Sequence, residues 1–219
     1  MAKKLFDFIV FDWDGTLMDS TATIVKCIQA AARDLQLPVP NDEAAAHVIG
    51  LGLVEAMQAV MPDVAPNYYP KMIERYRYHY LIRDHELPLF PGAREMLIDL
   101  AQQGYFLAVA TGKSRVGLNR AMNSANVLSM FDATRCADET FSKPHPAMLQ
   151  ELTRELGQDM QRTLMIGDTT HDLLMAANAG ASAIAVEYGA HDASLLASVP
   201  SLYSAKGISD LHQWLNDNA

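Results

Sequence analysis

Cysteine is scarce in this sequence of 219 residues, where only Cys27 and Cys136 occur. The two lie far apart and follow no spacing typical of metal ligands, and no His/Cys cluster suited to zinc is present. Two isolated thiols predict free cysteines in a reducing compartment rather than a disulfide framework. We therefore expect a cytoplasmic protein.

Long hydrophobic runs are missing as well. The stretch from Met1 to Lys4 is briefly basic, but the apolar run after it is interrupted by Asp7 and ends at Asp12. This pattern is not that of a signal peptide, and no stretch approaches the length of a membrane span. The sequence thus predicts neither a secretory signal nor a contact with a membrane.

Positive charge is in deficit, with 17 Lys and Arg against 26 Asp and Glu and a formal net charge of -9 at pH 7. No Lys/Arg cluster could follow a nucleic-acid backbone, so nucleic acid is not an expected partner. Any anionic ligand of such a protein must meet a local cation, either a metal ion or a well-placed lysine. Hydrophobic residues make up 50% of the chain, as is ordinary for a globular protein.

The apolar pattern changes twice along the chain. Residues 5–11 form a short aromatic and β-branched run that predicts a buried strand. From about 18 to 87, apolar residues recur at helical spacing without a strand signal, which predicts an all-helical insertion. Asp19 or Ser20 is the expected N-cap of its first helix.

Beyond Phe90-Pro91-Gly92, predicted helices alternate with predicted strands. Such alternation implies a parallel sheet covered by helices on both faces. The sequence therefore predicts an α/β fold, in which a Rossmann-like parallel-sheet core carries an inserted all-helical cap. Residues 1–17 and 88–219 are expected to form the core, and residues 18–87 the cap.

Polar motifs directly follow three of the predicted strands. They are Asp12-Trp13-Asp14, Thr111-Gly112-Lys113 and Gly167-Asp168. In open parallel sheets the ligand site lies outside the carboxyl ends of the strands. These three segments are therefore expected to meet in one crevice.

The carboxylates of that crevice indicate a metal and a nucleophile. Asp172 lies four residues beyond Asp168, and Asp12 and Asp14 are two apart. Carboxylates gathered in one place repel each other unless a cation joins them, and oxygen ligands of this kind suit Mg²⁺. A carboxylate next to Mg²⁺ can attack phosphorus, while a second one protonates the leaving oxygen and later activates water.

The remaining polar groups are suited to phosphate. Thr111 offers a hydroxyl, and Gly112 and Lys113 offer backbone N–H groups near the start of a helix, where anions bind well. Lys143 is flanked by Pro144 and Pro146, which stiffen the chain around it. A rigidly held lysine is a good partner for the equatorial phosphate oxygens.

Together these segments resemble the four motifs of the haloacid dehalogenase-like (HAD) superfamily, in the same order. The matching segments are 12–20, Thr111, Lys143 and 167–172. The resemblance covers nearly the whole chain and is greatest to the phosphoglycolate-phosphatase-like subgroup. It implies a Mg²⁺-dependent phosphatase, a phosphoric monoester hydrolase, that acts on a small phosphorylated metabolite as a monomer or a small homo-oligomer.

The resemblance also implies roles for the acidic residues. Asp12 would form an aspartyl-phosphate intermediate and give Mg²⁺ a carboxylate oxygen, as would Asp168. Asp14 would be the general acid/base and would give the metal its backbone carbonyl. Asp172 would orient the site from a second layer of residues around it.

Phosphate binding and substrate selection are implied in the same way. Thr111 and Lys143 would hold the phosphate, with Gly112 and Lys113 beside them. The cap loop that selects the substrate would fall at Gly50-Leu51-Gly52.

Two alternatives remain open at this stage. The first is a phosphosugar mutase of the same superfamily, but residues 21–27 lack the cap histidine that such mutases carry shortly after their first motif. The second is a non-catalytic phosphate-binding relative, although the retention of Asp12, Asp14, Thr111, Lys143 and Asp168 argues against it, because pure binding needs no acid/base pair. Asp14 also distinguishes a phosphatase from a dehalogenase, because dehalogenases lack an aspartate there.

The sequence says little about the substrate. No arginine or lysine lies close in sequence to Gly50, which disfavours a substrate whose far end carries a second strong anion, such as phosphoglycolate. Arg75, Arg77 or Arg83 from elsewhere in the cap could change that expectation.

Overall fold

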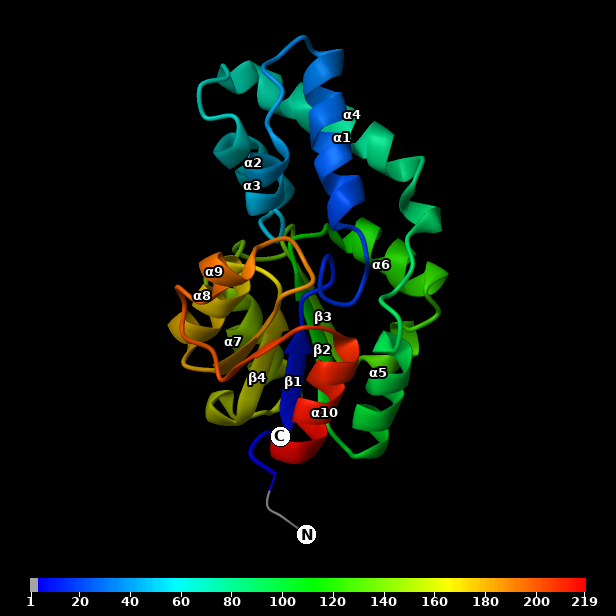
Figure 1. Cartoon of the computed structure of the whole chain (residues 1–219), viewed down its shortest axis with the longest axis vertical. Helices are drawn as coiled ribbons and strands as arrows, with labels where there is room; N and C mark the ends of the chain where they lie inside the picture. Colours follow the sequence, from blue (N-terminus) through cyan, green and yellow to red (C-terminus); the bar gives the residue numbers. More distant parts are fainter. Residues whose placement is uncertain (1–3) are drawn as a thin grey trace.

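The computed structural model describes residues 4–219, and its core is one six-stranded parallel sheet (Figure 1). The strand order is β3-β2-β1-β4-β5-β6, so that β1 lies in the middle of the sheet. Neighbouring strands all pair in parallel, which confirms the predicted Rossmann-like α/β class. The strands are β1 (Phe8–Phe11), β2 (Phe106–Thr111), β3 (Ala133–Cys136), β4 (Thr163–Gly167), β5 (Ser182–Val186) and β6 (Tyr203–Ala205).

Helices cover both faces of this sheet. They are α5 (Ala93–Gln102), α6 (Arg115–Ser124), α7 (Ala147–Leu156), α8 (Thr170–Ala179), α9 (Ala193–Leu196) and α10 (Ile208–Asn218). Side chains of β1 alternate between the two faces, as they must in a strand. Ile9 and Phe11 pack with α5, α6 and α10, whereas Phe8 and Val10 pack with α7 and α8. All four side chains are apolar and fully buried, so β1 runs through the interior and ends there.

The cap consists of four helices at the carboxyl end of the sheet (Figure 1). They are α1 (Thr21–Asp34), α2 (Asp42–His47), α3 (Leu53–Val60) and α4 (Tyr69–Leu81). The cap has a hydrophobic core of its own, in which Ile28, Met57 and Met72 are buried. The inserted all-helical cap is thus present, while its exact limits at residues 18 and 87 stay a prediction. The predicted core segment 1–17 begins in residues 1–3, which lie outside the described residues.

Two local expectations need correction. The predicted strand over 5–11 pairs only from Phe8 to Phe11. Ser20 occupies the N-cap position of α1, but it makes no capping hydrogen bond there. Its hydroxyl instead donates to Asp14 Oδ1 at 2.7 Å, so this side chain orients a residue of the candidate site and does not cap the helix.

Short 3-10 helices complete the chain, at Pro66–Tyr68, Asp84–Glu86, Leu128–Met130 and Met160–Arg162. Within residues 4–219, none of the helices combines the length and the apolar character that crossing a membrane would require. The C-terminus lies at the end of the core farthest from the cap (Figure 1).

Candidate active site

The site begins where β1 ends. Asp12 follows the last residue of this central strand and is fully buried. The chain then turns sharply through Gly15, whose φ of +80° is the left-handed conformation that glycine adopts without strain. A Cβ atom on Gly15 would lie 2.1 Å from Asp168 Oδ2. Glycine at this position therefore lets the first motif approach the loop that follows β4.

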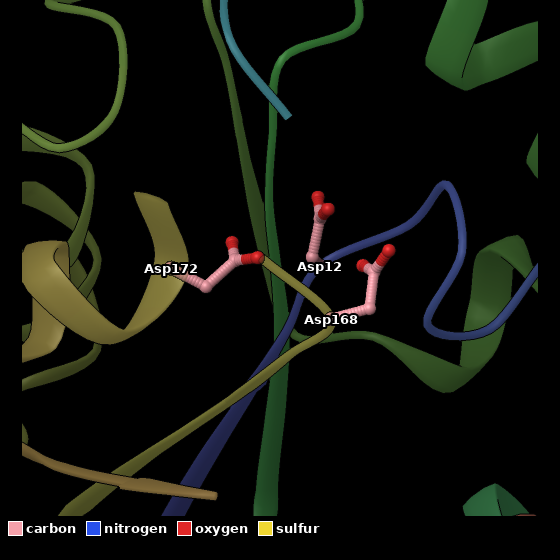
Figure 2. A group of neighbouring side chains, drawn as sticks. All are labelled: Asp12, Asp168 and Asp172. Atoms are coloured by element: carbon pink, nitrogen blue, oxygen red, sulfur yellow. The ribbon is translucent and has the colours of Figure 1, made fainter. Parts of the chain in front are cut away.

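Three buried carboxylates meet at this point (Figure 2). Asp12, Asp168 and Asp172 each place one oxygen within 4.8 Å of the others. Asp12 comes from the end of β1, Asp168 from the end of β4, and Asp172 from the first turn of α8. Parallel strands thus bring together residues that are far apart in the sequence, as expected for this fold.

Hydrogen bonds fix the orientation of two of these carboxylates. The Thr16 hydroxyl donates to Asp168 Oδ1 at 2.8 Å, and the Ala190 N–H donates to Asp168 Oδ2 at 2.7 Å. Asp172 Oδ2 accepts from the hydroxyl of Thr169 at 2.7 Å and from its N–H at 3.1 Å, which caps the start of α8. The site is therefore held in place before any ligand binds.

Lys143 is the cation inside this group. Its Nζ lies 2.6 Å from Asp172 Oδ1 and 2.7 Å from Asp12 Oδ1, and its side chain is fully buried. Burial lowers the pKa of the Lys143 ammonium, but the two carboxylates outweigh that effect and hold the pKa above its ordinary value. Lys143 therefore stays charged and offsets part of the negative charge.

One cation is too few for three carboxylates. Burial, reinforced by Asp172 and Asp168, raises the pKa of Asp12 well above its ordinary value, although Lys143 opposes the shift. Burial and the neighbouring Asp172 raise the pKa of Asp168 to about 7. Such shifts mean that the group would take up either protons or a metal cation.

The carboxylate of Asp12 has few polar partners in the protein. Apart from the ion pair with Lys143 at 2.7 Å, its oxygens have no polar partner among residues 4–219. Buried polar atoms are nearly always satisfied, so these oxygens point to a missing ligand. Oxygen donors in a buried cluster suit a hard divalent cation such as Mg²⁺.

Asp14 has different partners from Asp12. Its Oδ1 accepts from the Ser20 hydroxyl at 2.7 Å, and Lys113 Nζ lies 2.9 Å from each of its two oxygens. The same Nζ donates to the Tyr80 hydroxyl of α4 at 2.8 Å. Asp14 thus stands at the junction of core and cap, within a short chain of polar contacts that ends on a cap tyrosine.

The loop after β2 touches the cap directly. Thr111 is buried at the end of β2, and its Oγ1 accepts from the Lys113 N–H at 3.2 Å. A Cβ atom on Gly112 would lie 2.3 Å from the Leu51 carbonyl oxygen and 2.6 Å from that of Gly50. Only glycine allows this approach, which brings the predicted phosphate-binding loop against the predicted substrate-selecting loop.

A cavity of about 570 Å³ lies between core and cap. Its wall includes Asp12, Asp14, residues 111–113 and residues 50–52. Lys143, Asp168 and Asp172 are buried next to Asp12, behind the residues that form the wall. The predicted catalytic, phosphate-binding, metal-binding and cap-loop residues therefore lie on the wall of this cavity or next to Asp12.

Several contacts of the site were not foreseen. Thr16 and Ser20 lie within the first motif, so their hydroxyls could have been considered as partners of the aspartates. Tyr80 is one of several tyrosines on α4, together with Tyr69 and Tyr76, and tyrosines on a helix are typical of packing as much as of binding. Ala190 contributes only a backbone N–H, for which the sequence carries no signal.

Known proteins resemble this chain over most of its length. The family model of the haloacid dehalogenase-like hydrolases matches residues 9–186. The probable phosphatase IndB of Dickeya dadantii is 39% identical over 189 residues, which cover 84% of this chain and 82% of that protein. The phosphoglycolate phosphatase of Agrobacterium fabrum is 30% identical over 212 residues, which cover 92% of this chain and 89% of that protein.

Solved structures show the same fold. The crystal structure of a predicted phosphoglycolate phosphatase from Haemophilus somnus superposes with a TM-score of 0.87 at 23% identity, covering 97% of this chain and 99% of that one. The expected fold and the expected class of enzyme, a HAD-like phosphatase, are thereby confirmed. The chain belongs to the family of haloacid dehalogenase-like hydrolases.

Proposed function

We propose that this protein is a Mg²⁺-dependent phosphomonoester hydrolase that acts through an aspartyl-phosphate on Asp12. The observation that carries the proposal is the state of the Asp12 carboxylate. It lies on the cavity wall beside Asp168, and its one partner among the described residues is the Lys143 ammonium at 2.7 Å. A carboxylate on a cavity wall that is not tied up by several donors is suited to act as a nucleophile.

The carboxylates of Asp12 and Asp168 and the backbone carbonyl of Asp14 would hold the metal. Mg²⁺ bound there supplies positive charge that screens Asp12 from an anionic phosphate and polarises the phosphoryl oxygens. Asp172 is committed to Lys143 and to the first turn of α8, so it acts on the site by positioning that lysine.

In the first half of the reaction an oxygen of Asp12 attacks phosphorus. A bond forms between that oxygen and phosphorus, while the bond from phosphorus to the ester oxygen breaks. Asp14 would enter this step protonated and transfer its proton to the departing oxygen, so that a neutral alcohol leaves. Lys113 and Ser20, which contact its oxygens, would then stabilise the carboxylate that is left. Lys143, the Thr111 hydroxyl and the N–H groups of Gly112 and Lys113 hold the equatorial oxygens as negative charge redistributes.

In the second half Asp14, now a carboxylate, takes a proton from water. The hydroxide formed attacks phosphorus, and the bond between phosphorus and Asp12 breaks. Inorganic phosphate leaves, Asp12 is again a carboxylate, and Asp14 again carries its proton. The enzyme thus returns to its starting state with no net change in protonation.

The cap would decide which alcohol is accepted. The loop of Gly50, Leu51 and Gly52 lies on the cavity wall and touches Gly112, so a bound substrate would contact cap and core together. We propose a small phosphorylated metabolite as substrate. The cytoplasmic location, and the assembly as a monomer or small homo-oligomer, stay predictions from the sequence.

Replacing the nucleophile tests the mechanism. Asp12→Asn should abolish the Mg²⁺-dependent hydrolysis of p-nitrophenyl phosphate, while Asp63→Asn, the same change at an exposed cap position, should leave it unaltered. Wild type quenched in acid during turnover should carry phosphate on Asp12, detectable by peptide mass spectrometry. Substantial turnover by the Asp12→Asn variant would contradict the mechanism.

Product analysis separates hydrolysis from the two alternatives. A phosphatase releases inorganic phosphate in proportion to the substrate consumed, whereas a phosphosugar mutase yields an isomer. A protein that bound Mg²⁺ and phosphate but hydrolysed no ester would be the non-catalytic relative.

A further inference from the structure

We propose that the substrate's leaving group is uncharged, largely apolar and about the size of a ring, unlike the short acidic alcohol of phosphoglycolate. The inference rests on the proposed phosphatase function, because it concerns the part of the same cavity that lies beyond Asp12. It follows from four features of that cavity: its lining, its mouth, its charges and its size.

The cap side of the cavity is lined by apolar side chains. Helix α1 contributes Ile24 and Ile28, and α3 contributes Leu53 and Met57. None of these side chains offers a strong hydrogen-bond donor or acceptor. A polar or charged leaving group placed against them would lose its hydration without gaining a partner, at a cost in affinity.

The mouth of the cavity carries apolar side chains that are exposed to solvent. Val54 of α3 and Leu81 of α4 are each 49% exposed, and Val116 of α6 is 68% exposed. Two of them belong to the cap and one to the core, yet all three line the same cavity. Apolar residues gathered around an opening mark a surface that becomes covered when a ligand binds.

Two tyrosines of α4 add an aromatic surface. Tyr76 and Tyr80 both line the cavity, and their ring centroids lie 5.7 Å apart at an interplanar angle of 22°. Lys113 Nζ engages the hydroxyl of Tyr80 and also lies 4.6 Å from the centroid of its ring, so part of this ring faces a cation. The remaining aromatic surface of the two tyrosines is available for packing against a flat apolar group of the substrate.

The charges around the cavity do not favour an acidic leaving group. Lys113 is paired with Asp14, and Arg120 is paired with Asp84 at 2.6 Å. Glu55 and Asp138 also line the cavity, and neither offers a carboxylate any attraction.

The cap arginines contribute little positive charge to the cavity. Of Arg75, Arg77 and Arg83, only Arg77 lines the cavity, and it is exposed to solvent. Arg75 is paired with Asp34 instead, at 2.5 Å. An exposed cation at high dielectric attracts a carboxylate only weakly.

The size of the cavity points the same way. A volume of about 570 Å³ lies within the range typical of sites for ligands much larger than a two-carbon acid. Phosphate and glycolate together would leave much of the apolar wall in contact with water. A ring-sized apolar group would fill that space and remove the wall from solvent.

Kinetics on paired esters test the inference. We expect kcat/KM for benzyl phosphate and n-pentyl phosphate to exceed that for phosphoglycolate and glycerol 3-phosphate by about tenfold or more. All four are esters of alcohols, so differences in binding rather than in leaving-group chemistry should dominate. Equal or greater kcat/KM for phosphoglycolate or glycerol 3-phosphate would overturn the inference.

Variants at the mouth locate the effect. Val54→Thr and Val116→Thr keep the shape of the side chain but add a hydroxyl, at exposed positions where the fold does not depend on it. Each should lower kcat/KM for benzyl phosphate by roughly threefold to tenfold and leave glycerol 3-phosphate nearly unchanged. Val39→Thr, at a cap position 43% exposed and away from the cavity, is the matched control. Equal effects on both esters would contradict the proposal.

Binding of phosphonates separates this inference from the proposed function. Phosphonates are not hydrolysed, so calorimetry with benzylphosphonate and phosphonoacetate in the presence of Mg²⁺ reports the preference of the cavity without turnover. Tighter binding of benzylphosphonate supports an apolar cavity even if p-nitrophenyl phosphate is not hydrolysed, a result that would refute only the phosphatase mechanism. Tighter binding of phosphonoacetate refutes the inference and leaves the mechanism intact.

Discussion

Lys113 Nζ lies 2.9 Å from both carboxylate oxygens of Asp14, and so joins the loop after β2 to the loop after β1. The two residues are 99 positions apart in the chain. The pair faces the cavity, and its lysine also contacts Tyr80 of the cap. One ammonium group therefore links the proposed acid/base, the phosphate-binding loop and the cap.

Removal of that ammonium group should impair catalysis more than folding. Lys113→Met leaves Asp14 without its cationic partner and the phosphate without a neighbouring positive charge, so we expect kcat/KM on p-nitrophenyl phosphate to fall about 10- to 100-fold. Lys113→Arg, which keeps the charge, should retain more activity. Lys206→Met, at an exposed site on the core, provides the control. Wild-type kcat/KM in Lys113→Met would show that this contact plays no part in turnover.

Metal binding should stabilise the protein more at high pH than at low pH. In the folded state the pKa of Asp168 is raised to about 7 from an ordinary value of 3.8. The metal-free folded protein therefore binds more protons than the unfolded chain between these values, and it loses about 2–4 kcal/mol of stability as pH rises through them. Mg²⁺ replaces those protons, so the increase in Tm that it produces should be larger at pH 8 than at pH 5.5.

The matched variant for this measurement is Asp168→Asn. It removes one ionisable group and one metal ligand, so the metal-free variant should lose less stability with rising pH and should respond weakly to Mg²⁺. Thermal unfolding after treatment with a chelator, with and without added Mg²⁺, provides both comparisons. An equal increase in Tm at both pH values for wild type would count against a metal bound by these carboxylates.

A buried histidine should act on stability in the opposite direction. His191 Nδ1 accepts from the Thr170 N–H at 3.1 Å, which leaves its Nε2 to donate to the His47 carbonyl of the cap at 3.1 Å. Burial lowers the pKa of His191 from 6.5 to about 4. Between these values the unfolded chain binds more protons, so this histidine costs about 1–2 kcal/mol of stability on going from pH 7 to pH 5.

Urea unfolding of His191→Asn would isolate that contribution. Asparagine can still accept from the Thr170 N–H but does not titrate. The variant should therefore lose about 1–2 kcal/mol less unfolding free energy than wild type when the pH falls from 7 to 5. Other groups, including Asp168, titrate in both proteins and cancel in the comparison. Identical pH dependence of the two proteins would show that His191 is not held neutral.

Substitution of Gly112 should disturb the contact between core and cap. In Gly112→Ala the new methyl group would lie 2.3 Å from the Leu51 carbonyl, so one of the two loops must move. We expect a loss of about 1–3 kcal/mol in unfolding free energy and a fall in kcat/KM. Gly207→Ala is the control, because no atom lies within 4 Å of a Cβ there and the backbone is extended. Equal stability and activity of both variants would mean that the contact is easily displaced.

The sheet and its helices were largely predictable from the sequence. Strands β1, β2 and β4 are apolar runs, and a polar motif directly follows each of them. This pattern is typical of buried parallel strands with a ligand site at their carboxyl ends. The limits of β1 were less predictable, because Leu5 and Phe6 are apolar without pairing in the strand. Apolar side chains favour burial. Strand pairing also requires that a neighbouring strand extends alongside, and β2 and β4 pair with β1 only from Phe8 to Phe11.

The order of the strands, and with it the composition of the site, could be anticipated only in outline. The sequence indicated that Asp12 and Asp168 meet, since both follow strands. It did not indicate that Lys143 bridges Asp12 and Asp172, because the position of a loop lysine depends on how that loop packs. Ser20, one of the two residues expected to cap α1, instead donates to Asp14, since a hydroxyl at a helix start can bond to either partner.

The sequence alone determined the kind of protein. Its motifs, their order and their positions after predicted strands indicated a hydrolase of the HAD superfamily with a parallel-sheet core and a helical cap. Short motifs at strand ends are local features, so they can be read from the sequence. The tertiary structure decided what those motifs enclose: a lysine shared between Asp12 and Asp172, an Asp12 carboxylate with no other partner among the described residues, and a cavity with an apolar wall. These properties arise from side chains of distant segments at short distances, and only the folded chain fixes such distances.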